Sequence, residues 1–234
     1  MKTKSDHYWI SMSDMMTGLM IIFLFISVAY MIQLQQEQKE KNRMITEYVN
    51  IKNELSDELK KEFSNDFSKE NWDATIDSDL SIKFNNEYVL FDYNKSDLKD
   101  EFKKILDDFF PRYFKILLKD KYKNKILEVR IEGHTDSSGD YIYNLMLSNN
   151  RAAKVLEYFF ISPNSIFNRL NKDDQNLVKF WLTATGFSYG RVLDKNGLFV
   201  LETKGKEDAK RSRRVEFRVL TKSEALIEEI KSKD

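Results

Sequence analysis

Hydrophobic residues are concentrated near the start of the chain, where residues 15–36 carry no charged side chain. The apolar part of this run, residues 15–34, has the roughly 20 residues that a helix needs to cross a bilayer. A cleaved signal peptide would have a shorter apolar run and a small-residue cleavage site, for which Ala29-Tyr30-Met31 is a poor match. We therefore predict a retained transmembrane helix at residues 12–34, preceded by a short tail at residues 1–11.

The next segment, residues 35–72, is rich in Glu, Gln, Lys and Asn but keeps an apolar residue at spacings of three and four. This spacing is typical of an amphipathic helix. We interpret the segment as a helical linker that forms a stalk or a short coiled coil beyond the membrane. Its apolar positions are Ile45, Tyr48, Ile51, Leu55, Leu59, Phe63 and Phe67.

From residue 73 onward, strand-like and helix-like patterns alternate, which is typical of an α+β domain. Strands are predicted at residues 74–85, 88–91, 126–133, 180–187 and 214–220, and helices at residues 97–122 and 141–161. We expect Leu127, Val129 and Ile131 to share one face of their strand. The order βαβαββ allows one sheet with helices on one face at residues 73–222, followed by a helical tail at residues 223–234.

Composition narrows the functional classes. Lys plus Arg and Asp plus Glu balance at 38 each, so no global field draws the protein to nucleic acid. The chain has no cysteine, which excludes disulfide bonds, thiolate zinc sites and cysteine catalysis. The sequence offers no nucleophile–base pair, phosphate-binding loop or metal-ligand motif, so we predict that the protein is not an enzyme and needs no cofactor.

Asp14 lies at the edge of the predicted transmembrane helix, within one turn of Thr17 and Gly18. A carboxylate in this position costs free energy, about 3 kcal/mol or less on insertion scales. Two interpretations are open on these grounds. Asp14 is either the hydrated polar boundary of the helix, or a carboxylate that carries a proton or sodium ion by gaining and losing its charge.

The sequence around Asp14 resembles the start of the transmembrane helix in MotB-type stator subunits. The matching residues are Trp9, Ser13, Asp14, Met15, Met16, Thr17, Gly18, Leu19, Met20 and Phe23. The run W-I-S-M-S-D-M-M-T-G-L-M is most similar to the ZorB subunits of the Zorya anti-phage defence system. The resemblance implies that Asp14 is the ion carrier. It also implies a homodimer whose two helices lie inside a ring of a larger, multi-pass MotA-like (ZorA-like) subunit, which rotates as ions pass.

A second resemblance, to the C-terminal domain of the OmpA family, covers residues 74–220. The signature G-H-T-D-x-x-G…N…L-S-x-x-R-A is matched by Gly133-His-Thr-Asp-Ser-Ser-Gly139, Asn144, Leu147, Ser148, Arg151 and Ala152. Near the end of the chain, residues 211–218, R-S-R-R-V-E-F-R, resemble the companion motif N-R-R-V-E-F. Ser212 replaces the asparagine, and the loop after the third strand lacks the family's usual proline, so both features depart from the pattern.

The OmpA resemblance implies a binding site for the peptide stem of peptidoglycan, whose diaminopimelate carries a free amine and a carboxylate. Asp136 would bind the amine, and Arg151 would bind the carboxylate through its two-pronged guanidinium. Asn144 and Leu147 occupy lining positions on the same helix face as Arg151, and Arg214 is a further candidate. Alternatively, Asp136 caps the helix and pairs with Arg151 in a purely structural role.

Three other patterns point to no further site. His134 has no second histidine or cysteine at metal-binding spacing, so we predict a structural role and no metal. Residues 136–140 only loosely match a calcium loop. The basic run at residues 204–214 is diluted by acidic residues, so we predict a solvated face and no direct contact with nucleic acid.

Together, the two resemblances imply an ion-conducting, peptidoglycan-anchored B subunit of a proton- or sodium-driven rotary motor in the bacterial inner membrane. The N-terminus would be cytoplasmic and the C-terminal domain periplasmic, because that domain must reach the cell wall. In the homodimer we expect Ile45, Tyr48, Ile51 and Leu55 to pair across the two copies. The resemblance around Asp14 favours anti-phage defence, and the alternatives are a flagellar stator subunit and a passive wall anchor of the OmpA type.

Overall fold

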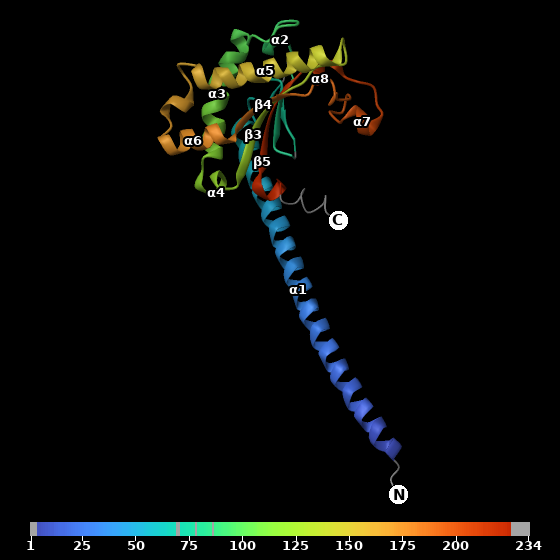
Figure 1. The fold of residues 1–234 in the computed structure, drawn as a ribbon. Coiled ribbons are helices and arrows are strands. Elements are labelled where there is room, and N and C mark those ends of the chain that lie inside the picture. Colours follow the sequence, from blue (N-terminus) through green and yellow to red (C-terminus); the bar gives the residue numbers. More distant parts are fainter. Residues whose placement is uncertain (1–3, 69–70, 78, 86, 226–234) are drawn as a thin grey trace. The chain divides into compact units, whose positions relative to one another are not determined.

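The computed structural model describes residues 4–68, 71–77, 79–85 and 87–225. The chain divides into two compact units, Met1–Glu47 and Tyr48–Asp234. Helix α1, Lys4–Phe63, accounts for the described part of the first unit and contributes its last turns to the second (Figure 1). The expected transmembrane and linker segments therefore form one helix, which ends at Phe63 and not at residue 72.

The helix of the first unit is apolar over the span that is predicted to cross the membrane. Its large side chains are exposed, among them Leu19, Phe23 and Phe25, each at least 63% exposed. Among the described residues, the structure contains one helix that is long and apolar enough to cross a membrane. The hydroxyl of Ser27 donates to the carbonyl of Phe23 at 2.8 Å, so this polar group is satisfied within the helix. Both properties suit hydrocarbon surroundings.

In the residues that the structure describes, the second unit is built on a five-stranded sheet, which confirms the predicted α+β class. Its strands are β1 Ala74–Ile76, β2 Ser81–Phe84, β3 Ile126–Gly133, β4 Leu182–Gly186 and β5 Val215–Thr221. The strand order is β1-β2-β5-β3-β4, in which β3 and β4 pair in parallel and the other neighbours pair antiparallel. The antiparallel edge strand β1 is an addition to the βαβαββ order.

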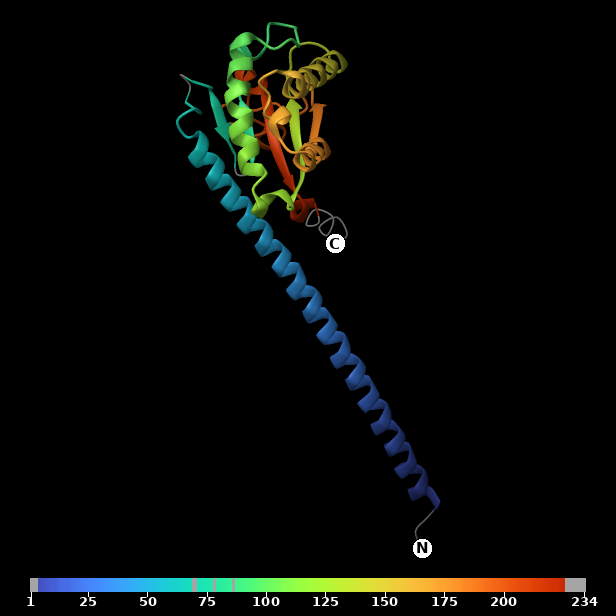
Figure 2. The ribbon, with the colours of Figure 1, turned by 90° about the vertical axis from the view of Figure 1, so that its left-hand side faces the viewer.

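Helices cover one face of this sheet, and α3, drawn in green, runs roughly along the direction of its strands in Figure 2. The helices after α1 are α2 Glu87–Leu90, α3 Asp100–Leu117, α4 Asp120–Lys123, α5 Tyr141–Ile161, α6 Lys172–Trp181, α7 Val200–Thr203 and α8 Ala209–Ser212, with a 3₁₀ turn at Ile166–Arg169. The helix-facing side of the sheet is aromatic at its centre, where Phe217 of β5 contacts Phe109 and Phe110 of α3. The core therefore lies between α3, α5 and the middle strands.

The end of α1 belongs to this core. Leu55, Leu59 and Phe63 are fully buried, and the ring of Phe63 packs on Phe109 at a centroid distance of 5.3 Å. The prediction that Leu55 pairs across a dimer was therefore wrong, because this part of the apolar stripe packs on its own domain. Ile45, which precedes the second unit, is 38% exposed.

Several predicted elements differ from the observed ones. The expected strand at residues 88–91 is helix α2 followed by a bridge between Phe91 and Leu98. The strand expected from residue 180 begins at residue 182, because α6 continues to Trp181. A register shift between Ile126 and Glu128 buries Ile126 in the core and leaves Leu127 only partly buried. Of the predicted tail, residues 222–225 are helical and residues 226–234 lie outside the described residues.

Two glycines set the position of α5 over the ends of β3 and β4. A Cβ atom at Gly133 would lie 2.1 Å from the carbonyl oxygen of Ser148, and one at Gly186 would lie 2.3 Å from the backbone nitrogen of Asn149. These two glycines are paired in the parallel β3–β4 register. Because neither carries a side chain, the helix backbone rests directly on the strand ends, and the loop after Gly133 opens beside α5.

Candidate functional site

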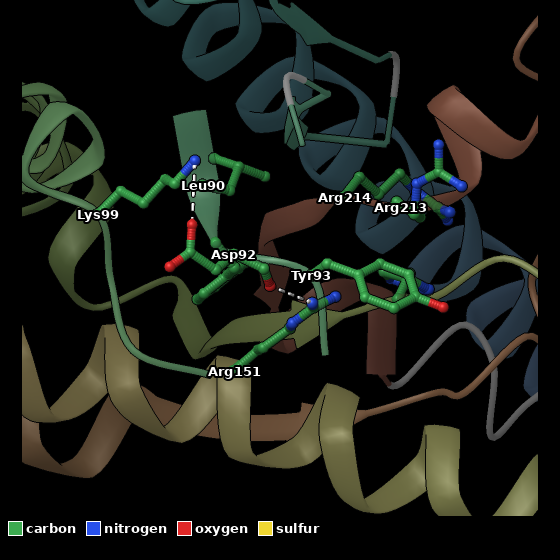
Figure 3. A pocket seen from close by; sticks show the side chains of 9 residues that line it. Leu90, Asp92, Tyr93, Lys99, Arg151, Arg213 and Arg214 are labelled. Atoms are coloured by element: carbon green, nitrogen blue, oxygen red, sulfur yellow. Dashed lines mark hydrogen bonds and ion pairs between the residues drawn. The ribbon is translucent and has the colours of Figure 1, made fainter. Parts of the chain in front are cut away.

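A pocket of about 360 Å³ lies where the loop after α2, helix α5 and the start of β5 meet (Figure 3). It is lined by Leu90, Phe91, Asp92, Tyr93, Lys99, His134, Arg151, Arg213 and Arg214. Among the described residues of this lining, four side chains are cationic and one, Asp92, is a carboxylate. The pocket therefore favours a ligand that carries negative charge.

Arg151 projects from α5 and holds the loop at one side of the pocket. Its Nε donates to the carbonyl of Lys95 at 2.9 Å, and its Nη2 donates to the carbonyl of Asp92 at 3.4 Å. The guanidinium also lies over the ring of Phe91, 4.9 Å from its centroid. Arg151 thus lines the pocket, and it supports the loop that carries Tyr93.

Asp136 lies in the loop after β3 and is paired with Arg213. Its Oδ2 accepts a hydrogen bond from Nη1 of Arg213, and its Oδ1 accepts from the backbone nitrogen of Ser138 at 3.0 Å. The alternative role of helix cap is wrong, because Asp140 caps α5 by accepting from the nitrogens of Ile142 and Tyr143. Asp136 itself is not in the pocket lining, but its partner Arg213 is.

Asn144 and Leu147 lie beside this loop and outside the pocket lining. The buried Asn144 donates from Nδ2 to the carbonyl of Ser138 at 2.7 Å, which fixes the loop to the first turn of α5. Leu147 is partly buried on the next turn. Asn144 therefore helps to shape the loop that presents Asp136.

Arg214 forms part of the pocket floor and is only 2% exposed. Its Nε donates to Oε1 of Glu216 at 2.5 Å, and its terminal nitrogens donate to the carbonyls of Ser212 and Arg191 at 3.1 and 3.2 Å. Burial lowers the pKa of Arg214, and the charge of Glu216 opposes that shift. With all three nitrogens engaged, Arg214 supplies a fixed positive charge beneath the ligand.

His134 lies beside Arg214 and is fully buried, so its environment tests the predicted structural role. Its Nε2 is 3.4 Å from Oε2 of Glu132 and 3.6 Å from Oε1 of Glu216, a grouping that suggests metal ligands. The same two oxygens, however, already pair with the guanidinium groups of Arg191 and Arg214. A divalent cation between these arginines would meet strong repulsion, so the donor set does not fit a metal.

Arg213 and Tyr93 are pocket residues that the sequence analysis missed. Arg213 is the first arginine of the R-R-V-E-F motif, and that position was the available signal. Tyr93 is 89% exposed on a turn in which Asn94 has a positive φ of 55° and Lys95 donates from its backbone nitrogen to the carbonyl of Asp92. Tyr93 belongs to no motif, so no signal in the sequence could have identified it as a pocket residue.

Asp14 lies in the first unit, on the exposed surface of α1. At spacings of three and four, Thr17 and Gly18 share its helix face. The hydroxyl of Thr17 donates to the carbonyl of Ser13 at 2.8 Å, and a Cβ atom at Gly18 would meet nothing within 4 Å. This face combines a carboxylate with open space for a neighbouring helix.

Part of the second unit matches a known family, and nearly the whole chain matches known proteins. A model of the OmpA family matches residues 90–170. The Zorya protein ZorB of Escherichia coli (Crooks strain) is 40% identical over 239 residues, covering 98% of this chain and 94% of that protein. The chain therefore belongs to the ZorB family. A second ZorB, from Escherichia coli O139:H28, is 29% identical and covers 93% of this ZorB-family chain and 83% of its own length.

Among solved structures, a MotB-like protein of Desulfovibrio vulgaris is similar to this chain, with 18% sequence identity. The match covers 76% of this chain and 94% of that one, with a TM-score of 0.48.

Proposed function

We propose that this ZorB family member is the peptidoglycan-anchored, ion-conducting B subunit of a rotary membrane motor that serves in anti-phage defence. The observation that carries the proposal is the cationic pocket, with Arg151 and Arg213 in its lining and Asp136 bonded to Arg213. A ligand with both a carboxylate and an amine matches these charges. The diaminopimelate of the peptidoglycan stem peptide is such a ligand.

The pair of Asp136 and Arg213 suggests how the ligand binds. The ligand amine would replace the guanidinium of Arg213 at Oδ2 of Asp136, and this exchange would release Arg213 toward the ligand carboxylate. Arg151 and the fixed charge of Arg214 would act on the same carboxylate. One charge is exchanged for another, so no buried carboxylate is left unpaired during binding.

The ion-carrying part of the proposal rests on α1. Asp14 shares a face with Thr17 and Gly18 on a helix suited to the membrane. We propose that the chain crosses the inner membrane once, with a cytoplasmic N-terminus and a periplasmic second unit. Two copies would place Asp14 inside a ring of a multi-pass MotA-like (ZorA-like) subunit, where the carboxylate carries a proton or sodium ion.

Sedimentation with purified sacculi tests the anchoring part directly. The full chain in detergent micelles should pellet with sacculi, and the free stem tripeptide that ends in diaminopimelate should release it into the supernatant. The same tripeptide ending in lysine is the control competitor, since lysine keeps the side-chain amine but lacks the carboxylate on the same carbon. A chain that stays in the supernatant, or that the tripeptide does not release, would contradict the proposal.

A further inference from the structure

The first turns of α5 present a neutral, partly aromatic surface next to the loop of Asp136. Residues 141–150 carry no charged side chain, although 32% of the chain is charged. Within this run Ile142 is 61% exposed, Tyr143 is 50% exposed and Met146 is 62% exposed. Exposed apolar side chains grouped in this way mark a surface that binds something.

Helical spacing makes this surface continuous with the residues of the candidate site. Leu147 and Arg151 are four residues apart on α5 and share one helix face. Tyr143 is four residues from Leu147 and three from Met146, so it lies between that face and the exposed face that carries Met146. Asn150 is exposed three residues after Leu147, on the same side. The surface thus has an aromatic ring, a flexible apolar side chain and an amide that donates and accepts hydrogen bonds.

We propose that this surface, formed by Ile142, Tyr143, Met146 and Asn150, binds the sugar strand of peptidoglycan; this inference rests on the proposed function. A sugar ring has an apolar face of C–H groups and a rim of hydroxyl and acetamido groups. Tyr143 and Met146 match the apolar face, and the amide of Asn150 matches the rim. Because the stem peptide is covalently linked to the sugar, a peptide held at Asp136 and Arg151 brings the sugar to a neighbouring surface at high effective concentration.

The absence of charge in this run distinguishes the sugar from other occupants. An acidic or basic protein partner would be expected to meet complementary charges, and residues 141–150 offer none. The hydrogen bond from Asn144 to the carbonyl of Ser138 fixes the loop of Asp136 to the same turns of α5 that carry this surface.

Two soluble ligands separate this subsite from the peptide pocket. The full chain in micelles is titrated calorimetrically with the free stem tripeptide and with the disaccharide tripeptide. Y143A and M146A should each weaken disaccharide tripeptide binding by about fivefold and leave tripeptide binding unchanged. F180A, which removes a side chain that is 68% exposed on α6, is the matched control and should change neither affinity.

Equal weakening for both ligands, or none for either, would overturn the sugar subsite while leaving the proposed function intact. A change in the oligomeric state of Y143A or M146A, measured by light scattering, would assign the surface to a contact between copies and would also overturn it. If the unsubstituted chain failed to bind the tripeptide, the proposed function and this inference would both fail.

Discussion

The guanidinium of Arg151 donates a hydrogen bond of 2.9 Å to the backbone carbonyl of Lys95, 56 residues away in the sequence. One side chain therefore provides charge to the pocket and holds the turn that carries Tyr93. R151K keeps the charge but lacks the planar fork that reaches two carbonyls. We expect it to bind the stem tripeptide about tenfold more weakly, measured by calorimetry.

The matched control for R151K is K154R, a change on the same helix at a residue that pairs with Glu157 on the surface. It should bind the tripeptide like the unsubstituted chain. Unchanged affinity of R151K would mean that Arg151 acts as a point charge and that its hold on the loop is irrelevant to binding.

The close approach of α5 to the sheet gives a stability prediction. An alanine at Gly133 would place its Cβ 2.1 Å from a backbone oxygen, which cannot move without shifting the helix. We expect G133A to lower the free energy of unfolding by about 3 kcal/mol or more, measured by denaturant titration. G205A is the control, because its nearest contact is the Thr203 hydroxyl at 3.1 Å. Equal stability of the two variants would contradict the packing of α5.

Glu58 should make the attachment of α1 sensitive to acid. Burial raises its pKa, but hydrogen bonds from Lys119 and Lys121 outweigh that effect and lower the pKa from 4.5 to about 2. Since the folded-state pKa is depressed, the stabilisation is present above about pH 4.5 and is lost as the pH falls toward 2. E58Q should lose stability at pH 7 and lose less on acidification than the unsubstituted chain. D57N, an exposed neighbour, should behave as unsubstituted, and an identical pH profile for E58Q would contradict the ion pairs.

Substitutions of Asp14 distinguish the motor-subunit hypothesis from the passive-anchor hypothesis. D14N keeps the shape of the side chain but cannot gain and lose charge, so it should abolish ion-dependent defence in cells while membrane levels and partner assembly persist. D14E should give partial or no function, because one added methylene displaces the carboxylate from its partner on the ring. Full activity of D14N at normal membrane levels would support the passive wall anchor.

The sequence predicted the features that are encoded by periodicity or by spaced motifs. The bounds of α5 and β3 match the predicted residues 141–161 and 126–133, and the α+β class is confirmed. The apolar stripe of the linker was recognised, but its partner was not, because spacing shows which residues need burial and not what buries them. Phe63, for example, packs against Phe109 of the same domain.

The candidate site was predicted in part for the same reason. The motif identified Asp136 and Arg151, which lie at or next to one pocket. A motif does not show which side chains form hydrogen bonds with each other in the folded chain. Arg213 bonds to Asp136 from 77 residues away, a pairing that depends on the antiparallel register of β3 and β5. Tyr93 was missed because it is an exposed loop residue that belongs to no motif in the sequence.

The most direct test of the wall anchor is the binding of D136A to purified sacculi, measured by sedimentation of the full chain in micelles. The substitution removes the group that receives the ligand amine, so retention should fall about thirtyfold or more. D173A, which removes an exposed carboxylate on α6, is the matched control and should be retained like the unsubstituted chain. Retention of D136A equal to that of D173A, with both chains folded by circular dichroism, would contradict the account.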